Sequence, residues 1–156
     1  MITVNQRAFL GMLAHSEIGT ALLATSDNGY NVIVGSTAAK PILFSSYADH
    51  PRRLIEVRPG LKSTAAGRYQ ILARYYDAYK KTLGLPDFSP YSQDAIALQM
   101  MKEQGVMPLL AAGNFADAVR ACSNIWASLP GAGYDQHENS FENLQAAYVQ
   151  AGGMLA

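Results

Sequence analysis

The segment AFLGMLAHSEIGT, residues 8–20, decides the predicted fold, because it carries an apolar helical stripe that ends in an acid. Residues at three- and four-residue spacing share one face of a helix. On that face Glu17 follows four apolar residues, Phe9, Leu10, Leu13 and Ala14. Gly19 then offers a helix stop. The sequence therefore predicts that Glu17 lies in the last helical turn, partly buried at the rim of a cleft.

Glu17 is a candidate proton donor for cleavage of a sugar chain. Partial burial disfavours an ionised carboxylate and raises its pKa. A carboxyl group that is still protonated near neutral pH can donate to a departing glycosidic oxygen, which typically contributes about 10²–10⁴-fold in rate. The simpler alternative is a solvated glutamate at the end of an amphipathic helix, and this segment taken alone favours that alternative.

The composition is that of one globular domain covering residues 1–156, with 49% hydrophobic residues. Charged residues make up 15%, below the roughly 25% that is usual for soluble domains. Twelve basic and twelve acidic side chains cancel. No bulk field is therefore available to hold a nucleic acid or an anionic membrane.

One stretch departs from this balance. Between residues 52 and 74, Glu56 is accompanied by six basic residues, Arg52, Arg53, Arg58, Lys62, Arg68 and Arg74. A carboxylate-bearing polymer would suit such a patch. The charges by themselves favour an ordinary solvated face.

Cys122 is the single cysteine, so no internal disulfide forms, and a small buried thiol is its expected state. A signal peptide has a basic region before an apolar core, and the amino-terminal residues do not show this pattern. No segment approaches the roughly 20 apolar residues of a membrane span. We expect the chain to stay in the cytoplasm until another factor releases it.

Helix signals dominate after residue 60. Ser89 with Pro90 predicts a helix start, and Gly105 predicts its end. A polar residue followed three residues later by an acid predicts two further starts, and glycine ends the last helix. These signals are Asn114 with Asp117, Asn139 with Glu142, and Gly152, while 72–83 is an aromatic, periodic helix.

Residues 20–60 differ, since the turn signal at 27–29 is followed by short β-favouring runs at 32–34 and 42–44. A small sheet or hairpin is predicted there. Pro51 and Pro59 indicate an exposed loop, a plausible flap over a cleft. The predicted fold class is α+β, with a mainly helical body, a small β-lobe and a cleft between them.

Two later segments are rich in groups that bind sugars. In AGRYQIL, residues 66–72, Tyr69 and Gln70 supply a ring and an amide after a glycine. In NIWASLPGAGY, residues 124–134, a polar and aromatic cluster lies in a loop, where binding residues often occur. This cluster consists of Asn124, Trp126, Ser128 and Tyr134.

These segments resemble the lambda-type phage endolysins, over nearly the whole chain and at matching spacing. The resemblance is carried by AFLGMLAHSEIGT (8–20), GYNVIVG (29–35), SYADHPRRL (46–54), LKSTAAGRYQIL (61–72), LGLPDFSPYSQDAIALQ (83–99) and CSNIWASLPGAGY (122–134). The resemblance implies a single lysozyme-like catalytic domain. It also implies a lytic transglycosylase that cleaves the MurNAc–GlcNAc bond of peptidoglycan without water, for host lysis.

In that family the one catalytic glutamate stands at the position of Glu17, acting first as acid and then as base. The candidate substrate-binding residues are His50, Tyr69, Gln70, Tyr75, Tyr76, Asn124, Trp126, Ser128 and Tyr134. The resemblance implies no cofactor or metal. It also implies glycan strands as substrate and a holin that opens the way from the cytoplasm to the periplasmic wall. A monomer is expected. His15 and the pair Tyr75–Tyr76 stand where the family carries tryptophans.

A hydrolysing muramidase of the phage T4 type remains the alternative, with Asp27 as the second acid ten residues after Glu17. Asp27 lies in an Asp-Asn-Gly turn, where a turn-forming role is sufficient.

Two other functions have weaker support in the sequence. A zinc amidase would need three ligands and an open position, but His15, His50, His137 and Cys122 are scattered. A non-catalytic wall-binding protein has no reason to bear the cost of the half-buried Glu17.

Overall fold

The computed structural model describes residues 1–132 and 138–156. The chain forms two compact units. The first, here called the helical unit, contains Met1–Glu17 and Ala97–Ala156, and the second, the strand unit, contains Ile18–Ile96. Each is described by itself.

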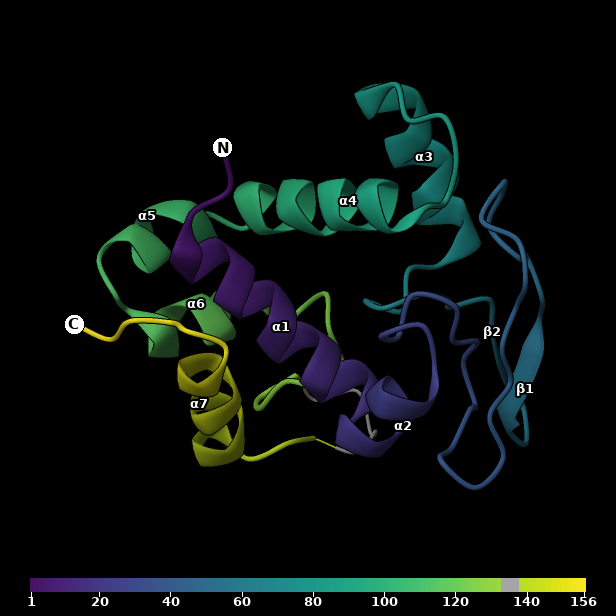
Figure 1. Cartoon of the computed structure of the whole chain (residues 1–156), viewed down its shortest axis with the longest axis horizontal. Coiled ribbons are helices and arrows are strands. Elements are labelled where there is room, and N and C mark those ends of the chain that lie inside the picture. The colour runs from purple at the N-terminus through teal and green to yellow at the C-terminus, as the bar shows by residue number, and fades with distance from the viewer. Residues whose placement is uncertain (133–137) are drawn as a thin grey trace. The chain divides into compact units, whose positions relative to one another are not determined.

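The helical unit is built around α1 (Val4–Ile18), of which all but the last residue belongs to this unit. The end of α4 (Pro90–Glu103) also belongs to it, together with three shorter helices, α5 (Val106–Ala111), α6 (Phe115–Cys122) and α7 (Phe141–Gln150). Figure 1 shows α5, α6 and α7 around the amino-terminal part of α1. The predicted apolar stripe of α1 is fully or almost fully buried, which explains why these helices gather on it.

An aromatic cluster forms the core of this unit. The Phe115 ring stacks on Tyr148 at 4.6 Å between centroids and meets the edge of Phe9 at 6.2 Å. Asn5 ties the same helices together by its amide. Its Nδ2 donates to the Leu110 carbonyl at 2.7 Å, and its Oδ1 accepts from the Met154 backbone N–H at 2.9 Å. A buried amide satisfied on both sides fixes how these segments meet.

Most of the predicted helix boundaries are confirmed. Pro90 begins α4, and the Asn114 side chain accepts from the Asp117 N–H at the start of α6. The last predicted start was wrong by one residue. The side chain that caps α7 is Ser140, which accepts from the Asn143 N–H, because the Asn139 side chain is bonded elsewhere.

The strand unit contains α2 (Thr20–Thr25), α3 (Ala73–Leu83), the start of α4 and a two-stranded antiparallel sheet. Figure 1 shows its strands, β1 (Ile55–Arg58) and β2 (Leu61–Ser63), side by side. Ile55 pairs with Ser63 and Glu56 with Lys62. The predicted combination of helices with a small sheet is confirmed, and the cleft stays a prediction.

The position of the sheet differs from the prediction. Residues 32–34 and 42–44 form no regular strand and are joined by an isolated antiparallel bridge, Val32 to Leu43, while Ile33 forms a second bridge, to Ala66. Val32 and Ile33 are buried in succession, so their backbone does not continue as a strand with one face inward. The hairpin forms where an exposed loop was expected, because Gly60, with a φ of 78°, allows the chain to reverse.

The core of the strand unit includes a buried amide as well as rings. Gln93 is fully buried, and its Nε2 donates to the carbonyls of Tyr30 and Phe88 while its Oε1 accepts from the Arg68 N–H. The ring of Phe88 packs on Tyr76 at 5.1 Å.

None of the described helices is long and apolar enough to cross a membrane.

Candidate active site

Glu17 lies in the last turn of α1, as predicted. The helix ends at Ile18, and Gly19 adopts a φ of 86°, which a glycine tolerates without strain. The side chain is half-buried. Burial raises the pKa of Glu17 from 4.5 to about 7, an effect opposed by a hydrogen bond from Ser128. The group can therefore both give and take a proton near neutral pH.

A chain of three polar side chains, Ser128, Ser16 and Asn139, leads away from this carboxyl group. The Ser128 Oγ donates to Glu17 Oε1 at 3.1 Å, and Ser16 Oγ lies 2.7 Å from Ser128 Oγ. The Asn139 Nδ2 donates to both the carbonyl and the hydroxyl oxygen of Ser16, each at 3.1 Å. Segments more than a hundred residues apart in sequence thus converge on Glu17.

The loop after α6 places Ser128 because its neighbours are anchored. The Trp126 N–H donates to the Cys122 carbonyl at 3.1 Å, and Trp126 is only 3% exposed. Leu129 is fully buried. With residues 126 and 129 turned inward, Ser128 is left half-buried beside Glu17. Trp126 itself was predicted to bind sugar, and its burial favours a packing role instead.

Asn124 and Tyr134 were the other predicted binding residues of this segment. Asn124 is exposed, and its Nδ2 donates to Gln104 Oε1 at 3.1 Å. Tyr134 lies outside the described residues. Asn124 is thus accessible to a ligand.

The segment AGRYQIL forms a tight loop in the strand unit. The Ala66 and Ile71 backbones pair in an isolated bridge, and Gln70 adopts a φ of 51° between them. The Gln70 Nε2 donates to the Gly67 carbonyl at 2.8 Å. The Gln70 amide group predicted for sugar binding therefore braces its own loop.

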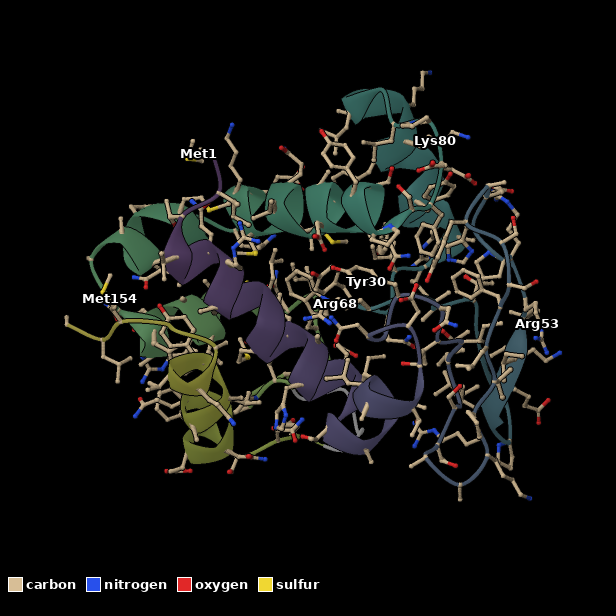
Figure 2. All side chains as sticks on the ribbon, in the orientation of Figure 1. Met1, Tyr30, Arg53, Arg68, Lys80 and Met154 are labelled. Atoms are coloured by element: carbon tan, nitrogen blue, oxygen red, sulfur yellow. The ribbon has the colours of Figure 1, made fainter. Side chains whose placement is uncertain are left out.

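Tyr69 is occupied within the protein. Its ring is 1% exposed, and its hydroxyl donates to Asp94 Oδ1 at 2.6 Å. Tyr30 donates to the same oxygen at 3.0 Å, and burial together with the Asp94 charge raises the pKa of Tyr30 to about 12. Figure 2 shows Arg68 beside Tyr30, and its guanidinium carbon lies 5.2 Å from that ring centroid.

His50 and the tyrosine pair of α3 divide between core and surface. His50 Nδ1 accepts from the Arg52 N–H, so Nε2 carries the proton and donates to the Ile71 carbonyl at 2.8 Å. Burial lowers the pKa of His50, which keeps the ring neutral. Tyr76 is fully buried, whereas Tyr75 is 42% exposed under the Arg74 guanidinium. Of these three residues, Tyr75 is the one that is accessible for stacking on a sugar.

Asp27, the second acid of the alternative mechanism, has different surroundings from Glu17. Asp27 is exposed, and Tyr47 donates to its carboxylate. Its backbone carbonyl accepts from the Tyr30 N–H at 2.9 Å, which is the turn role expected from the sequence. Asp27 therefore serves the turn and holds the Tyr47 hydroxyl.

The described residues contain no group of three or more His, Cys, Asp or Glu side chains that could hold a metal ion. His137 lies outside them. Cys122 is buried, and burial raises the pKa of its thiol to about 12, which disfavours the thiolate that a metal requires.

Sequence reasoning missed two residues of this site, Ser16 and Asn139. The sequence indicates Asn139 only as a helix start, and Ser16 only as a neighbour of Glu17. One signal was available, since Ser16 is next to the candidate acid and offers a hydroxyl. No local pattern, however, indicates that residue 139 meets residue 16.

Comparisons with known proteins show the family of the chain. Residues 7–155 match the family model described as Endolysin. The chain is 53% identical to the endolysin of Escherichia phage lambda, covering 99% of this chain and 97% of that protein. It is 48% identical to the endolysin of Escherichia phage P2, covering 97% of this chain and 95% of that protein.

Solved structures give the same result. The lysozyme of bacteriophage lambda complexed with a chitohexasaccharide matches with a TM-score of 0.93 and 51% identity, covering 100% of this chain and 99% of that chain. A second structure of the lambda lysozyme matches with a TM-score of 0.87. The resemblance predicted from the sequence is confirmed. A family match over residues 7–155 and two relatives covered almost end to end establish that the chain belongs to the endolysin family of phage cell-wall lysis enzymes.

Proposed function

We propose that this chain is a lytic transglycosylase that cleaves the MurNAc-β-1,4-GlcNAc bond of peptidoglycan and leaves 1,6-anhydro-MurNAc ends. The observation that carries the proposal is the carboxyl group of Glu17, half-buried and hydrogen-bonded to Ser128, with a pKa of about 7. A group with this pKa is suited to act as acid and base in one reaction cycle.

In the proposed reaction, Glu17 first gives its proton to the glycosidic oxygen as the bond from that oxygen to C1 of MurNAc breaks. The resulting carboxylate then takes the proton of the C6 hydroxyl of the same sugar while O6 bonds to C1. Glu17 ends protonated, and no water is consumed. One carboxylate is sufficient, because the nucleophile belongs to the sugar, whereas most hydrolysing glycosidases use two.

A glycan substrate is supported by the similar lambda lysozyme, which was solved with a chitohexasaccharide. In this chain we assign direct sugar contacts to the accessible groups, Ser128, Asn124 and Tyr75. The buried residues would then support the surface of their own unit from beneath, Trp126 in the helical unit and Tyr69, Tyr76 and His50 in the strand unit, and Gln70 would hold its loop. Tyr134 stays a proposed contact.

The hydrolysing alternative requires Asp27 to activate water. The hydrogen bond from Tyr47 and the role of Asp27 in its turn favour a structural residue instead.

The proposal for release is that a holin lets the enzyme reach the periplasmic wall from the host cytoplasm. We further propose that the enzyme acts as a monomer, without cofactor.

Mass spectrometry of soluble muropeptides released from purified Gram-negative peptidoglycan tests the reaction type. Products one water lighter than muramidase fragments, with no new reducing ends, are expected. Reducing MurNAc ends would mean that water attacks, and would overturn the transglycosylase proposal. In the same assay Glu17→Gln should lower release by at least about 10²-fold, since Gln cannot donate an acidic proton. A folded Glu17→Gln protein with full activity would refute the role of Glu17.

A further inference from the structure

We propose that Asn139 is a positioning residue that sets the direction of a hydrogen-bond chain through Ser16 and Ser128, so that Oε2 of Glu17 carries the transferable proton. The inference rests on the proposed function, since it assigns the atom from which Glu17 acts. Four residues of the helical unit carry it, and all are described.

The orientation of the Asn139 amide follows from one contact. Its Nδ2 lies 3.1 Å from the Ser16 backbone carbonyl, which can only accept. The nitrogen must therefore face Ser16, and its second N–H reaches Ser16 Oγ at 3.1 Å. The Asn139 backbone N–H also donates to the Ser128 carbonyl at 2.9 Å, so the residue is held from both sides.

The two hydroxyl groups then have a defined order. Ser16 Oγ accepts from Asn139, and its own proton points to Ser128 Oγ, 2.7 Å away. The Ser128 proton in turn points to Glu17 Oε1 at 3.1 Å. In the reverse order, the Ser16 proton would have no acceptor among the described residues. Ser16 is only 9% exposed, and an unpaired buried donor is unfavourable.

The order of the chain decides which oxygen of Glu17 is acidic. Because Oε1 accepts from Ser128, the proton of the neutral acid resides on Oε2. Without a fixed order, Oε1 could also hold the proton and donate it to Ser128. Asn139 thus removes an unproductive arrangement of the acid, which is a form of preorganisation.

Asn139→Asp tests this directly, because the side chain keeps its shape but the donor becomes an acceptor. The Ser16 proton then turns toward residue 139, so Ser128 can donate to Ser16 Oγ, and its hydrogen bond to Glu17 weakens. We expect kcat for muropeptide release to fall about tenfold. The high-pH limb of the activity profile should move upward, because the Ser128 hydrogen bond lowers the pKa of Glu17.

The carboxylate that this substitution introduces at position 139 could also raise the pKa of Glu17 directly. A double-mutant cycle with Ser128→Ala separates the two effects. If Asn139 acts through the chain, Asn139→Asp should add little loss and little pH shift once Ser128 is absent. The full loss and shift in the Ser128→Ala background would overturn the proposal.

Asn143→Asp is the matched control, since it is the same chemical change at an exposed position of α7. It should keep wild-type kcat and pH profile. If Asn139→Asp does not unfold cooperatively, Ser16→Ala interrupts the chain with a smaller change. It should also lower kcat, because Asn139 no longer fixes the Ser128 hydroxyl, but the pH shift should be smaller, because Ser128 can still donate to Glu17. Wild-type kinetics in a folded Ser16→Ala or Asn139→Asp protein would refute the inference. Reducing ends from the wild-type protein would instead refute the reaction type.

Discussion

In its proposed role, Glu17 serves the reaction at the expense of the stability of the fold. Its folded-state pKa of about 7 lies above the value of 4.5 for an unperturbed glutamate. As pH rises past 4.5, the unfolded chain therefore loses this proton before the folded chain does. Linkage requires that folding lose stability across this range. The raised pKa of the acid is thus obtained at a loss of folding free energy.

Glu17→Gln should remove that loss. At pH 4 both proteins carry a neutral side chain at position 17, and their free energies of unfolding should be similar. At pH 8 the variant should be more stable by up to about 3 kcal/mol, because Gln never ionises. Urea unfolding at the two pH values measures the difference. A gain that is the same at both would show that Glu17 is not desolvated in the folded protein.

Asp27→Asn should keep most of the activity. The amide oxygen of Asn still accepts from the Tyr47 hydroxyl, and Asn suits the turn as well as Asp does. The measurement is the initial rate of muropeptide release, together with thermal unfolding as a control for the fold. A loss of about 10²-fold or more in a folded protein would make Asp27 catalytic and favour the hydrolysing mechanism.

At the scale of elements, the sequence predicted what short-range chemistry decides. The starts of α4 and α6 follow from Ser89-Pro90 and Asn114, because the Ser89 and Asn114 side chains accept from backbone N–H groups three residues later. The start of α7 was misplaced because Asn139 bonds to Ser16, a contact across 123 residues. The sheet was misplaced for the same kind of reason. Val32 and Ile33 are buried by distant segments such as Ala66.

Gly67→Ala should destabilise the protein more than the addition of one methyl group to the AGRYQIL loop usually does. A Cβ there would overlap the buried Gln93 side chain, and the φ of 83° disfavours any L-residue. We expect a loss of about 3 kcal/mol in the free energy of unfolding. Gly60→Ala is the control, because Gly60 has a φ of 78° but open space around it, and should lose about 1 kcal/mol. Equal losses of unfolding free energy in the two variants would mean that the Gln93 side chain moves aside at little energetic cost.

At the scale of the whole molecule, the sequence predicted the acid but not its surroundings. Glu17 stood out because its helix stripe is local, and the resemblance assigned its role. Tyr69, Tyr76 and Trp126 were predicted to bind sugar through their rings, and all three side chains are buried. Residue type alone does not distinguish a core ring from an exposed one, since both are apolar bodies with a polar edge.

Release of muropeptides from purified peptidoglycan should be unchanged by EDTA. The proposed reaction uses only Glu17 and groups of the sugar, so removing divalent ions leaves it intact. Isolated wall is the appropriate substrate, because EDTA also permeabilises intact Gram-negative cells. Loss of release with EDTA, restored by zinc, would favour the amidase hypothesis, whose candidate ligands are His15, His50, His137 and Cys122.

The helical unit joins the first seventeen residues to the segment from Ala97 onward, while the strand unit is continuous between them. Synthesis on the ribosome therefore delivers Glu17 early and Ser128 111 residues later. A nascent chain can complete the strand unit long before the acid meets its hydrogen-bond partners. Fragments left by interrupted translation contain Glu17 but not Ser128 and Asn139, the surroundings that the proposed proton donor needs. If Glu17 and Asn139 have the proposed roles, the activity requires that translation has passed Asn139.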